Sequence, residues 1–272
     1  MSDGTLTPPA TVEAAFANPL FAPIRPWLAQ LPPRPDSAAL NTLLEAHPRQ
    51  TANGLPLRFP PPQDDGLGYE ARIHARGEVE TRPDNWHDFF NALVWLTFPE
   101  AKSHLSASHM RAMRPEGEGR GLARDALTHF DECGIVVLSS QPDLLDLLRG
   151  FHWRELFVTR RQDVIDGMRF IVFGHATYEQ LLAPFRGLTA KAALHPVSPS
   201  TLDQPLEQLL PAVDRLLADD LASGRYQRPR DFQPLPLLGI PGVVAENNNS
   251  AYYEDIWQFR PGRRALKEDA QH

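Results

Sequence analysis

The sequence predicts an α+β protein, with one helix-rich domain around a small mixed β-sheet and a Pro-rich N-terminal arm. Helical periodicity dominates the middle of the 272-residue chain, and apolar runs at 135–140 and 168–174 interrupt it as buried strands would. Hydrophobic residues make up 42%, an ordinary globular share, whereas 27 prolines predict many short connections. A chain of this length can bury one core, so we expect a single domain over residues 37–262.

The two ends of the chain are expected to lie outside this domain. Prolines recur through residues 1–36, and Phe16, Phe21 and Trp27 stand between them. Because aromatic side chains are rare in freely solvated tails, we expect residues 1–36 to pack on the body as an arm. Residues 263–272 are expected to form a C-terminal tail.

The first regular elements of the domain follow a Pro- and Gly-rich break at 59–68. Residues 69–82 alternate roughly as a strand pair with Gly77 at the turn. A helix is then expected to begin with a cap at Asp84 or Asn85. It should be buried, since the sequence WHDFFNALVWLTF is apolar on nearly all sides.

Helices and strands alternate through the middle of the chain. Pro99 suits the first turn of a helix, and residues 119–133 form another, with Gly134 in the left-handed closing position. The strand at 135–140 and a short helix at 142–148 come next.

After the strand at 168–174, Thr177 and Gln180 form a capping box that opens a helix. One more amphipathic helix is expected over 205–221, and residues 229–250 have the composition of turns and loops.

Composition excludes several classes of function. A formal net charge of -7 argues against a broad nucleic-acid footprint and against binding to an anionic membrane, since both need clustered positive charge. No apolar run approaches about 18 residues, so no membrane span is expected. The single Cys133 and the absence of a signal-like start fit the cytoplasm.

A crowding of histidine and carboxylate residues between 86 and 134 is the main functional signal. Asp125, His129 and Glu132 are spaced i, i+4, i+7, which places them along one strip of a helix. That strip could hold a metal or relay a proton. The alternative is that its carboxylates are solvated and His129 sits at the edge of an apolar face.

Four other histidines are weaker candidates. His87 and Asn91 stand i, i+4 on the apolar helix and need polar partners, in a site or in a satisfied core pair. His104 and His109 are five apart, so at most one of them belongs to the site. His175 follows a strand and precedes a helix, where α/β sheets place ligand-contacting residues.

Known catalytic motifs are missing from the sequence. Cys133 lies at a helix C-terminus, where the helix dipole disfavours a thiolate. No P-loop, G-x-G-x-x-G or G-x-S-x-G motif is present, so no nucleotide cofactor is expected.

Several strings in order resemble a bacterial family, the domain of unknown function DUF3025. These are NWHDFFNALVWLTFPEAKSHL, THFDECGIVV, FGHATYEQL, LPLLGIPG and the later FRPGR, over roughly residues 40 to 262. The resemblance implies a proteobacterial intracellular protein and brings no activity, fold or catalytic residue. Val243 and Val244 stand where the family often has aromatic residues.

The working hypothesis is a metal-dependent hydrolase. Its pocket gathers the candidates named above around a divalent ion, Zn or Mg. The ligands are taken from His129, Asp125 and Glu132, and a carboxylate not bound to the ion takes the proton. His87, Asn91 and His175 complete the catalytic set.

Two alternatives stay open. A non-catalytic binding or regulatory protein would use an Arg and aromatic surface at Trp153, Arg154, Phe157 and Arg160. A His-Asn-His-like nuclease would use His87 and Asn91, although their spacing departs from that motif. The small-molecule or protein partner and the oligomeric state are not fixed by the sequence.

Overall fold

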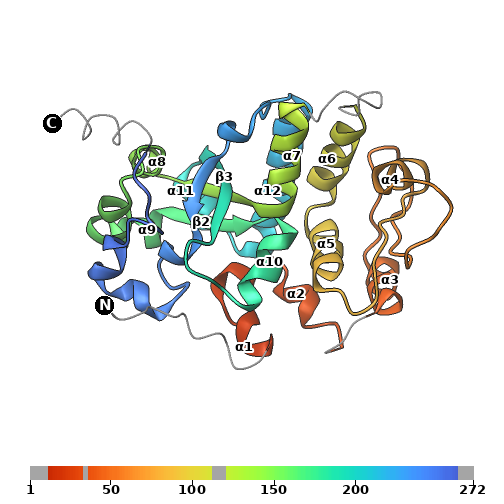
Figure 1. Cartoon of the computed structure of the whole chain (residues 1–272), viewed down its shortest axis with the longest axis horizontal. Helices are drawn as coiled ribbons and strands as arrows, with labels where there is room; N and C mark the ends of the chain where they lie inside the picture. The colour runs from red at the N-terminus through yellow and green to blue at the C-terminus, as the bar shows by residue number, and fades with distance from the viewer. Residues whose placement is uncertain (1–11, 33–35, 112–120, 263–272) are drawn as a thin grey trace.

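The computed structural model of the protein describes residues 12–32, 36–111 and 121–262, and its architecture is α+β (Figure 1). The tail expected at 263–272 and the first eleven residues of the arm lie outside this description. The described part of the arm forms three short helices: α1 (Val12–Phe16), η1 (Pro19–Phe21) and α2 (Arg25–Leu28). Leu20, Phe21 and Ile24 of this segment are buried in the core.

The sheet has four strands: β1 (Gly134–Ser139), β2 (Met168–Val172), β3 (Thr189–Pro196) and β4 (Gln233–Pro236). Their order is β2-β1-β3-β4. β1 runs parallel to β3 and antiparallel to β2, and β4 runs antiparallel to β3, so the predicted mixed sheet is confirmed. The sequence pattern did not indicate β3 or β4. β4 contains two prolines, which an edge strand tolerates.

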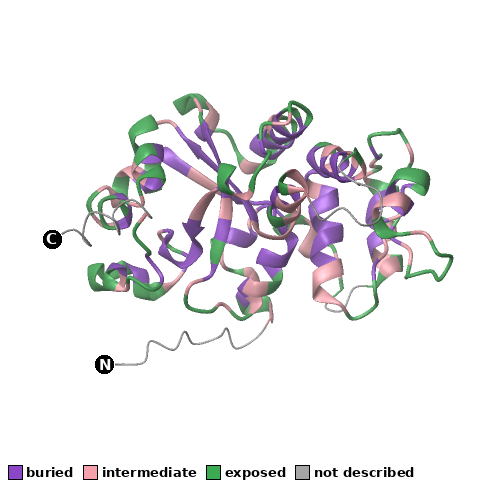
Figure 2. Ribbon diagram, turned by 45° about the horizontal axis from the view of Figure 1, so that its top comes forward, coloured by how far each residue is buried: buried purple, intermediate pink, exposed green. Residues whose placement is uncertain are grey.

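Helices cover both sides of this sheet, which is itself largely buried (Figure 2). In Figure 1 the helices to the left are α8 (Pro142–Arg149) and α9 (Arg161–Gly167), and those to the right are α7 (Leu122–Cys133), α10 (His175–Leu182) and α12 (Leu206–Ala222). Farther right lie α5 (Trp86–Thr97) and α6 (Pro99–Arg111), followed by α3 (Ser37–Ala46) and α4 (Tyr69–Arg76). The remaining short helices are α11 (Pro199–Leu202), η2 (Glu155–Thr159), η3 (Pro229–Asp231), η4 (Leu237–Gly239), η5 (Ala245–Asn248) and η6 (Ser250–Glu254).

The buried helix α5 is confirmed. The Asn85 side chain caps it by accepting a hydrogen bond from the Asp88 backbone N–H at 2.9 Å. All residues from Phe89 to Leu96 are buried, which agrees with the apolar sequence. α6 begins at Pro99 as expected.

The strand pair expected over residues 69–82 is wrong, because residues 69–76 form helix α4. Gly77 adopts a left-handed conformation with φ 71°, and there it ends a helix instead of turning a hairpin. Arg72 in this helix is fully buried and forms ion pairs with Asp65, Glu78 and Glu80. The strand prediction relied on an alternation of apolar and polar residues, and it fails here because the polar Arg72 is buried.

Two helix ends also differ from expectation. Gly134 is extended, with φ -72° and ψ 144°, and it begins β1 at once instead of closing α7 in a left-handed turn. α10 begins at His175, two residues earlier than expected, with Gly174 at the N-cap position. Thr177 is therefore inside the first turn and does not cap the helix.

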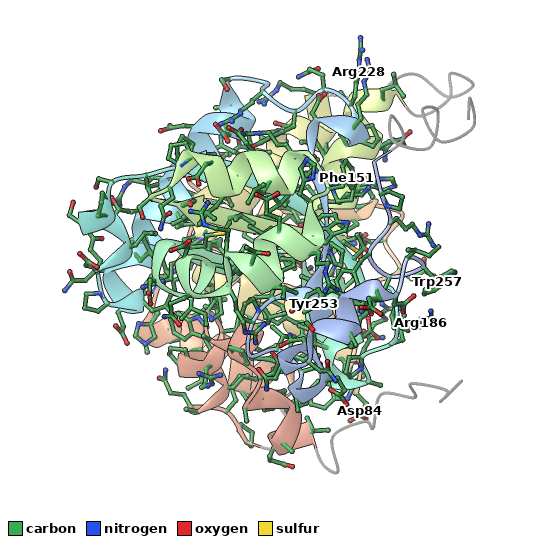
Figure 3. All side chains as sticks on the ribbon, turned by 90° about the vertical axis from the view of Figure 1, so that its left-hand side faces the viewer. Asp84, Phe151, Arg186, Arg228, Tyr253 and Trp257 are labelled. Atoms are coloured by element: carbon green, nitrogen blue, oxygen red, sulfur yellow. The ribbon has the colours of Figure 1, made fainter. Side chains whose placement is uncertain are left out.

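The C-terminal segment packs on the body through short 3-10 helices. The Tyr253 hydroxyl donates to the Gly239 carbonyl at 2.8 Å. Trp257 stays half exposed, and the guanidinium groups of Arg186 and Arg260 lie over its ring (Figure 3).

Candidate metal centre

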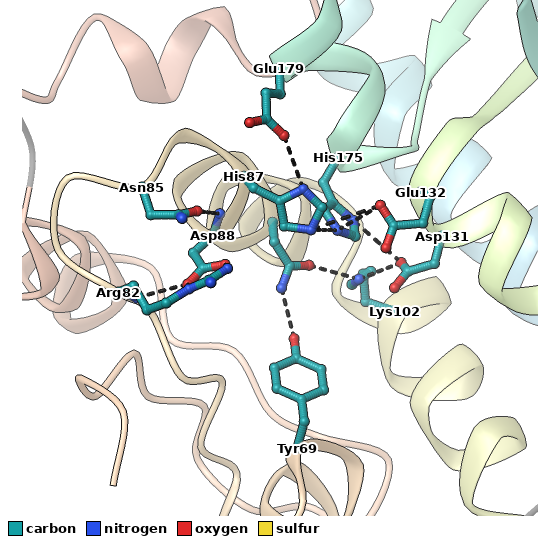
Figure 4. A network of polar contacts seen from close by, with 11 residues as sticks. Tyr69, Arg82, Asn85, His87, Asp88, Lys102, Asp131, Glu132, His175 and Glu179 are labelled. Atoms are coloured by element: carbon teal, nitrogen blue, oxygen red, sulfur yellow. Dashed lines mark hydrogen bonds and ion pairs between the residues drawn. The ribbon is translucent and has the colours of Figure 1, made fainter.

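Three side chains from three helices meet at one point: His87 of α5, Glu132 of α7 and His175 of α10 (Figure 4). The Nε2 atoms of His87 and His175 lie 3.0 Å apart. Glu132 Oε2 lies 3.8 Å from His87 Nε2 and 3.6 Å from His175 Nε2. Within the described ranges, no other three His, Cys, Asp or Glu side chains bring their ligand atoms this close together.

Gly174 allows the N-terminus of α10 to reach the C-terminus of α7. The backbone N–H groups of Phe173 and Gly174 both donate to the Gly134 carbonyl, at 3.0 and 2.8 Å. A Cβ atom at Gly174 would lie 2.4 Å from Gly134 N and 2.5 Å from the Glu132 carbonyl oxygen. Because only glycine fits there, the turn holds His175 beside Glu132.

Two further carboxylates face the outer nitrogens of the two imidazoles. Glu179 Oε2 lies 3.1 Å from His87 Nδ1, which is hydrogen-bond distance. Asp131 Oδ1 lies 3.9 Å from His175 Nδ1, an ion-pair distance without a hydrogen bond. The Glu179 contact favours a hydrogen on His87 Nδ1, which leaves His87 Nε2 free to accept the hydrogen bond from His175 Nε2. A cation bound between the two Nε2 atoms would take the place of that hydrogen.

The distances suit a metal ion. In a triangle with sides of 3.0, 3.6 and 3.8 Å, the point equidistant from the three ligand atoms lies roughly 2.0 Å from each. Zinc binds imidazole nitrogen and carboxylate oxygen at about 2.0–2.2 Å. Magnesium prefers oxygen ligands and retained water, so the two imidazoles favour zinc.

The charges around the cluster suit ligands that must be deprotonated. Burial lowers the pKa of His175 to about 3, with Lys102 acting in the same direction, so the imidazole is neutral. Burial opposes ionisation of Asp131, but the Lys102 ammonium outweighs it and holds the pKa of Asp131 below its usual value. Burial, then the charges of Asp131 and Glu179, raise the pKa of Glu132. Glu132 is therefore the ligand whose ionisation would gain most from a cation.

A buried lysine connects the cluster to α4. Lys102 Nζ lies 2.5 Å from Asp131 Oδ1 and donates to Asn91 Oδ1 at 2.9 Å. Asn91 Nδ2 then donates to the Tyr69 hydroxyl oxygen at 2.7 Å. Asn91 therefore belongs to a satisfied polar network next to the cluster and directs neither polar atom at the two histidines.

This cluster opens into a cavity of about 240 Å³. The cavity is lined by polar side chains: Tyr69, Glu70, Arg82, His87, Asp88, Asn91, His109, Arg124, Thr128, Asp131, Glu132 and His175. Asp88 is held there by Arg82, whose Nε lies 2.7 Å from Asp88 Oδ2.

The structure brings together only part of the predicted site. His87, Glu132 and His175 converge, whereas Asp125 and His129 do not join them, and His129 is exposed. The strip of α7 that faces the cavity is Arg124, Thr128 and Asp131. Its i, i+4, i+7 spacing equals that of the predicted strip, but it starts one residue earlier and is turned by about 100°. Glu132 lies at its edge.

Sequence reasoning missed the supporting groups Tyr69, Lys102, Asp131 and Glu179. Asp131 could have been predicted, because the neighbouring strip of α7 has the same i, i+4, i+7 spacing and contains it. Lys102 and Glu179 carry no local signal, since their partners lie 29 and 92 residues away.

The predicted Arg and aromatic surface is only half exposed. Trp153 and Phe157 are buried and stack with 6.2 Å between ring centroids, so they cannot serve as surface contacts. Arg154 pairs with Glu254 at 3.3 Å, and Arg160 pairs with Asp143 and Asp163.

The fold and this centre define an α+β protein with a clustered His/Glu/His site under a polar cavity. A family model, "Protein of unknown function (DUF3025)", matches residues 59–263, and the chain belongs to this family. No curated protein and no solved structure matched the chain. In the described part of the chain, no helix is both long and apolar enough to cross a membrane.

Proposed function

We propose that the protein is a metal-dependent hydrolase that holds one zinc ion through His87 Nε2, His175 Nε2 and Glu132 Oε2. The observation that carries the proposal is the 3.0 Å separation of the two Nε2 atoms, each on an imidazole whose other nitrogen faces a carboxylate. Carboxylate–histidine–metal arrangements of this kind fix the imidazole tautomer and raise its basicity.

A zinc ion held by these three ligands would supply a Lewis acid and would activate a water molecule for hydrolysis. The chain's own residues orient the site. Glu179 holds the His87 ring, and Lys102 keeps Asp131 ionised opposite His175.

Glu70 is the candidate for proton transfer. It lines the same cavity, and its carboxylate accepts a hydrogen bond from the Ser106 hydroxyl at 2.7 Å. Burial, the largest influence, raises the pKa of Glu70. A carboxyl group with a raised pKa exchanges protons more readily near neutral pH than an exposed one does.

A cytoplasmic, bacterial setting is part of the proposal. The single Cys133, which is unpaired, and the family resemblance support it.

Metal content and hydrolysis of simple chromogenic esters test this proposal together. Protein purified without a metal-binding tag should contain about one zinc ion per chain and hydrolyse carboxylic or phosphoric esters. Dipicolinate treatment should remove the ion and the activity, and added zinc should restore both.

Substitutions locate the ion. His175→Ala should lose it, whereas His129→Ala, at an exposed histidine on α7, should retain it and provide a matched control. Wild-type protein that binds no divalent ion, or activity that survives complete removal of the ion, would refute the proposal.

A further inference from the structure

The cavity beside the metal centre is also lined by hydrogen-bond donors other than the three proposed ligands. Arg124 and Thr128 line it from α7, and Tyr69 lines it from α4. Arg124 precedes Asp131 by seven residues, which is two helical turns or roughly 10 Å along the axis. A ligand that reaches both Arg124 and the metal centre would therefore carry two separate polar groups.

The Tyr69 hydroxyl is one of these donors. Its oxygen already accepts a hydrogen bond from Asn91 Nδ2, and Asn91 is held in that orientation by Lys102. Burial of the hydroxyl, then the charges of Asp131 and Glu70, raise the pKa of Tyr69, so the hydroxyl stays protonated. No acceptor among the described residues takes that proton, although the Tyr69 ring is partly exposed.

Arg124 is the second donor. It forms no ion pair or hydrogen bond with any residue in the described ranges, whereas the other arginine of the cavity, Arg82, is bound by Asp88. A guanidinium group offers five N–H donors in a geometry that matches carboxylate and phosphate.

The carboxylates of the cavity do not cancel this charge by direct contact. Asp88 is paired with Arg82, and Asp131 is paired with Lys102. Glu70 is bonded to Ser106 and senses Arg124 only as a nearby charge. Arg124 is thus available to a ligand.

We propose that the substrate carries an anionic oxygen group, a carboxylate or a phosphate, which is bound in this cavity by Arg124, with the Tyr69 hydroxyl as a further donor. The proposal rests on the hydrolase proposal for the position of the reacting bond, which would lie near the metal.

Calorimetric titration with acetate and methyl phosphate tests the anion site, since the two probes share a methyl group and differ in the anion. Both zinc-loaded and chelator-treated protein should be titrated, because an anion could also bind the ion. At least one probe should bind the chelator-treated wild type. Arg124→Gln should weaken this binding about tenfold or more, and Tyr69→Phe about threefold, since charge-assisted hydrogen bonds are the stronger kind.

Arg215→Gln is the matched control, because Arg215 is exposed on α12 and its replacement changes the net charge equally. It should leave the affinity unchanged. The tighter probe identifies the anion as carboxylate or phosphate. Binding of neither probe to the chelator-treated protein, or equal affinities in wild type and Arg124→Gln, would overturn the anion site. The zinc content of the same samples tests the metal site of the hydrolase proposal independently of anion binding.

Discussion

His175 and His195 are both 4% exposed histidines beside a carboxylate, yet their surroundings differ. His175 faces a second imidazole, and both line an open cavity. His195 Nε2 lies 3.3 Å from Asp220, whose oxygens already accept hydrogen bonds from Arg225 and the Tyr226 hydroxyl. The two histidines therefore differ in whether they line a cavity, and only His175 is part of the candidate site.

The largest expected difference between the two clusters is in the free energy of unfolding. Lys102→Met removes the cation that pairs with the part-buried Asp131, and it should lower stability by about 3–5 kcal/mol. Arg225→Met should cost only about 0–1 kcal/mol, because the Arg225 side chain is 46% exposed. Urea unfolding of both variants measures the difference. Equal losses of stability would mean that the Lys102–Asp131 pair contributes no more than the exposed Arg225–Asp220 pair.

Metal affinity should distinguish the clusters next. Glu179→Gln weakens the hold on His87 Nδ1, and we expect zinc affinity to fall about 10- to 100-fold. Asp220→Asn changes the carboxylate beside His195 and should leave zinc affinity unaltered. Competition with a zinc-binding dye provides the constants. A similar loss in both variants would contradict the assignment of Glu179.

The smallest effect concerns pH and belongs to His195. Burial, then the Arg225 charge, lower the pKa of His195 below 6.5, and the Asp220 charge opposes them. The unfolded chain therefore binds a proton at a higher pH than the folded chain does. Stability from this group is complete above pH 6.5 and is lost as the pH falls through the lowered pKa, with a slope of at most about 1.4 kcal/mol per pH unit. His195→Gln should reduce the slope of the free energy of unfolding against pH in chelator-treated protein. Urea unfolding from pH 7 to 5 measures this slope, and an unchanged slope would contradict the lowered pKa of His195.

The sequence predicted those parts of the fold whose signals are local. The apolar run of α5 and its Asn85 cap predicted a buried helix, and the apolar run at 135–140 predicted β1. The strand pair at 69–82 failed because Gly77 suits a helix end as well as a hairpin. The alanine-rich β3 and the proline-containing β4 form through pairing with distant partners, which no local pattern reveals.

In the candidate site, too, the sequence revealed local features but not those that depend on packing between distant elements. His87, Glu132 and His175 were all candidates, because their residue types and positions within elements are visible in the sequence. Their convergence depends on the close approach at Gly174, and the rotation of α7 depends on how that helix packs on the sheet. His129 was chosen because a helical strip is known only up to its rotation about the axis.

Zinc K-edge X-ray absorption of the loaded protein tests the ligand set most directly. We predict two imidazoles and at least one carboxylate oxygen near 2.0 Å from the ion in the wild type, within the roughly 2.0–2.2 Å range of such bonds. His87→Ala should show one imidazole, and His129→Ala should still show two. One imidazole in the wild type, or two in His87→Ala, would contradict the centre formed by His87, Glu132 and His175.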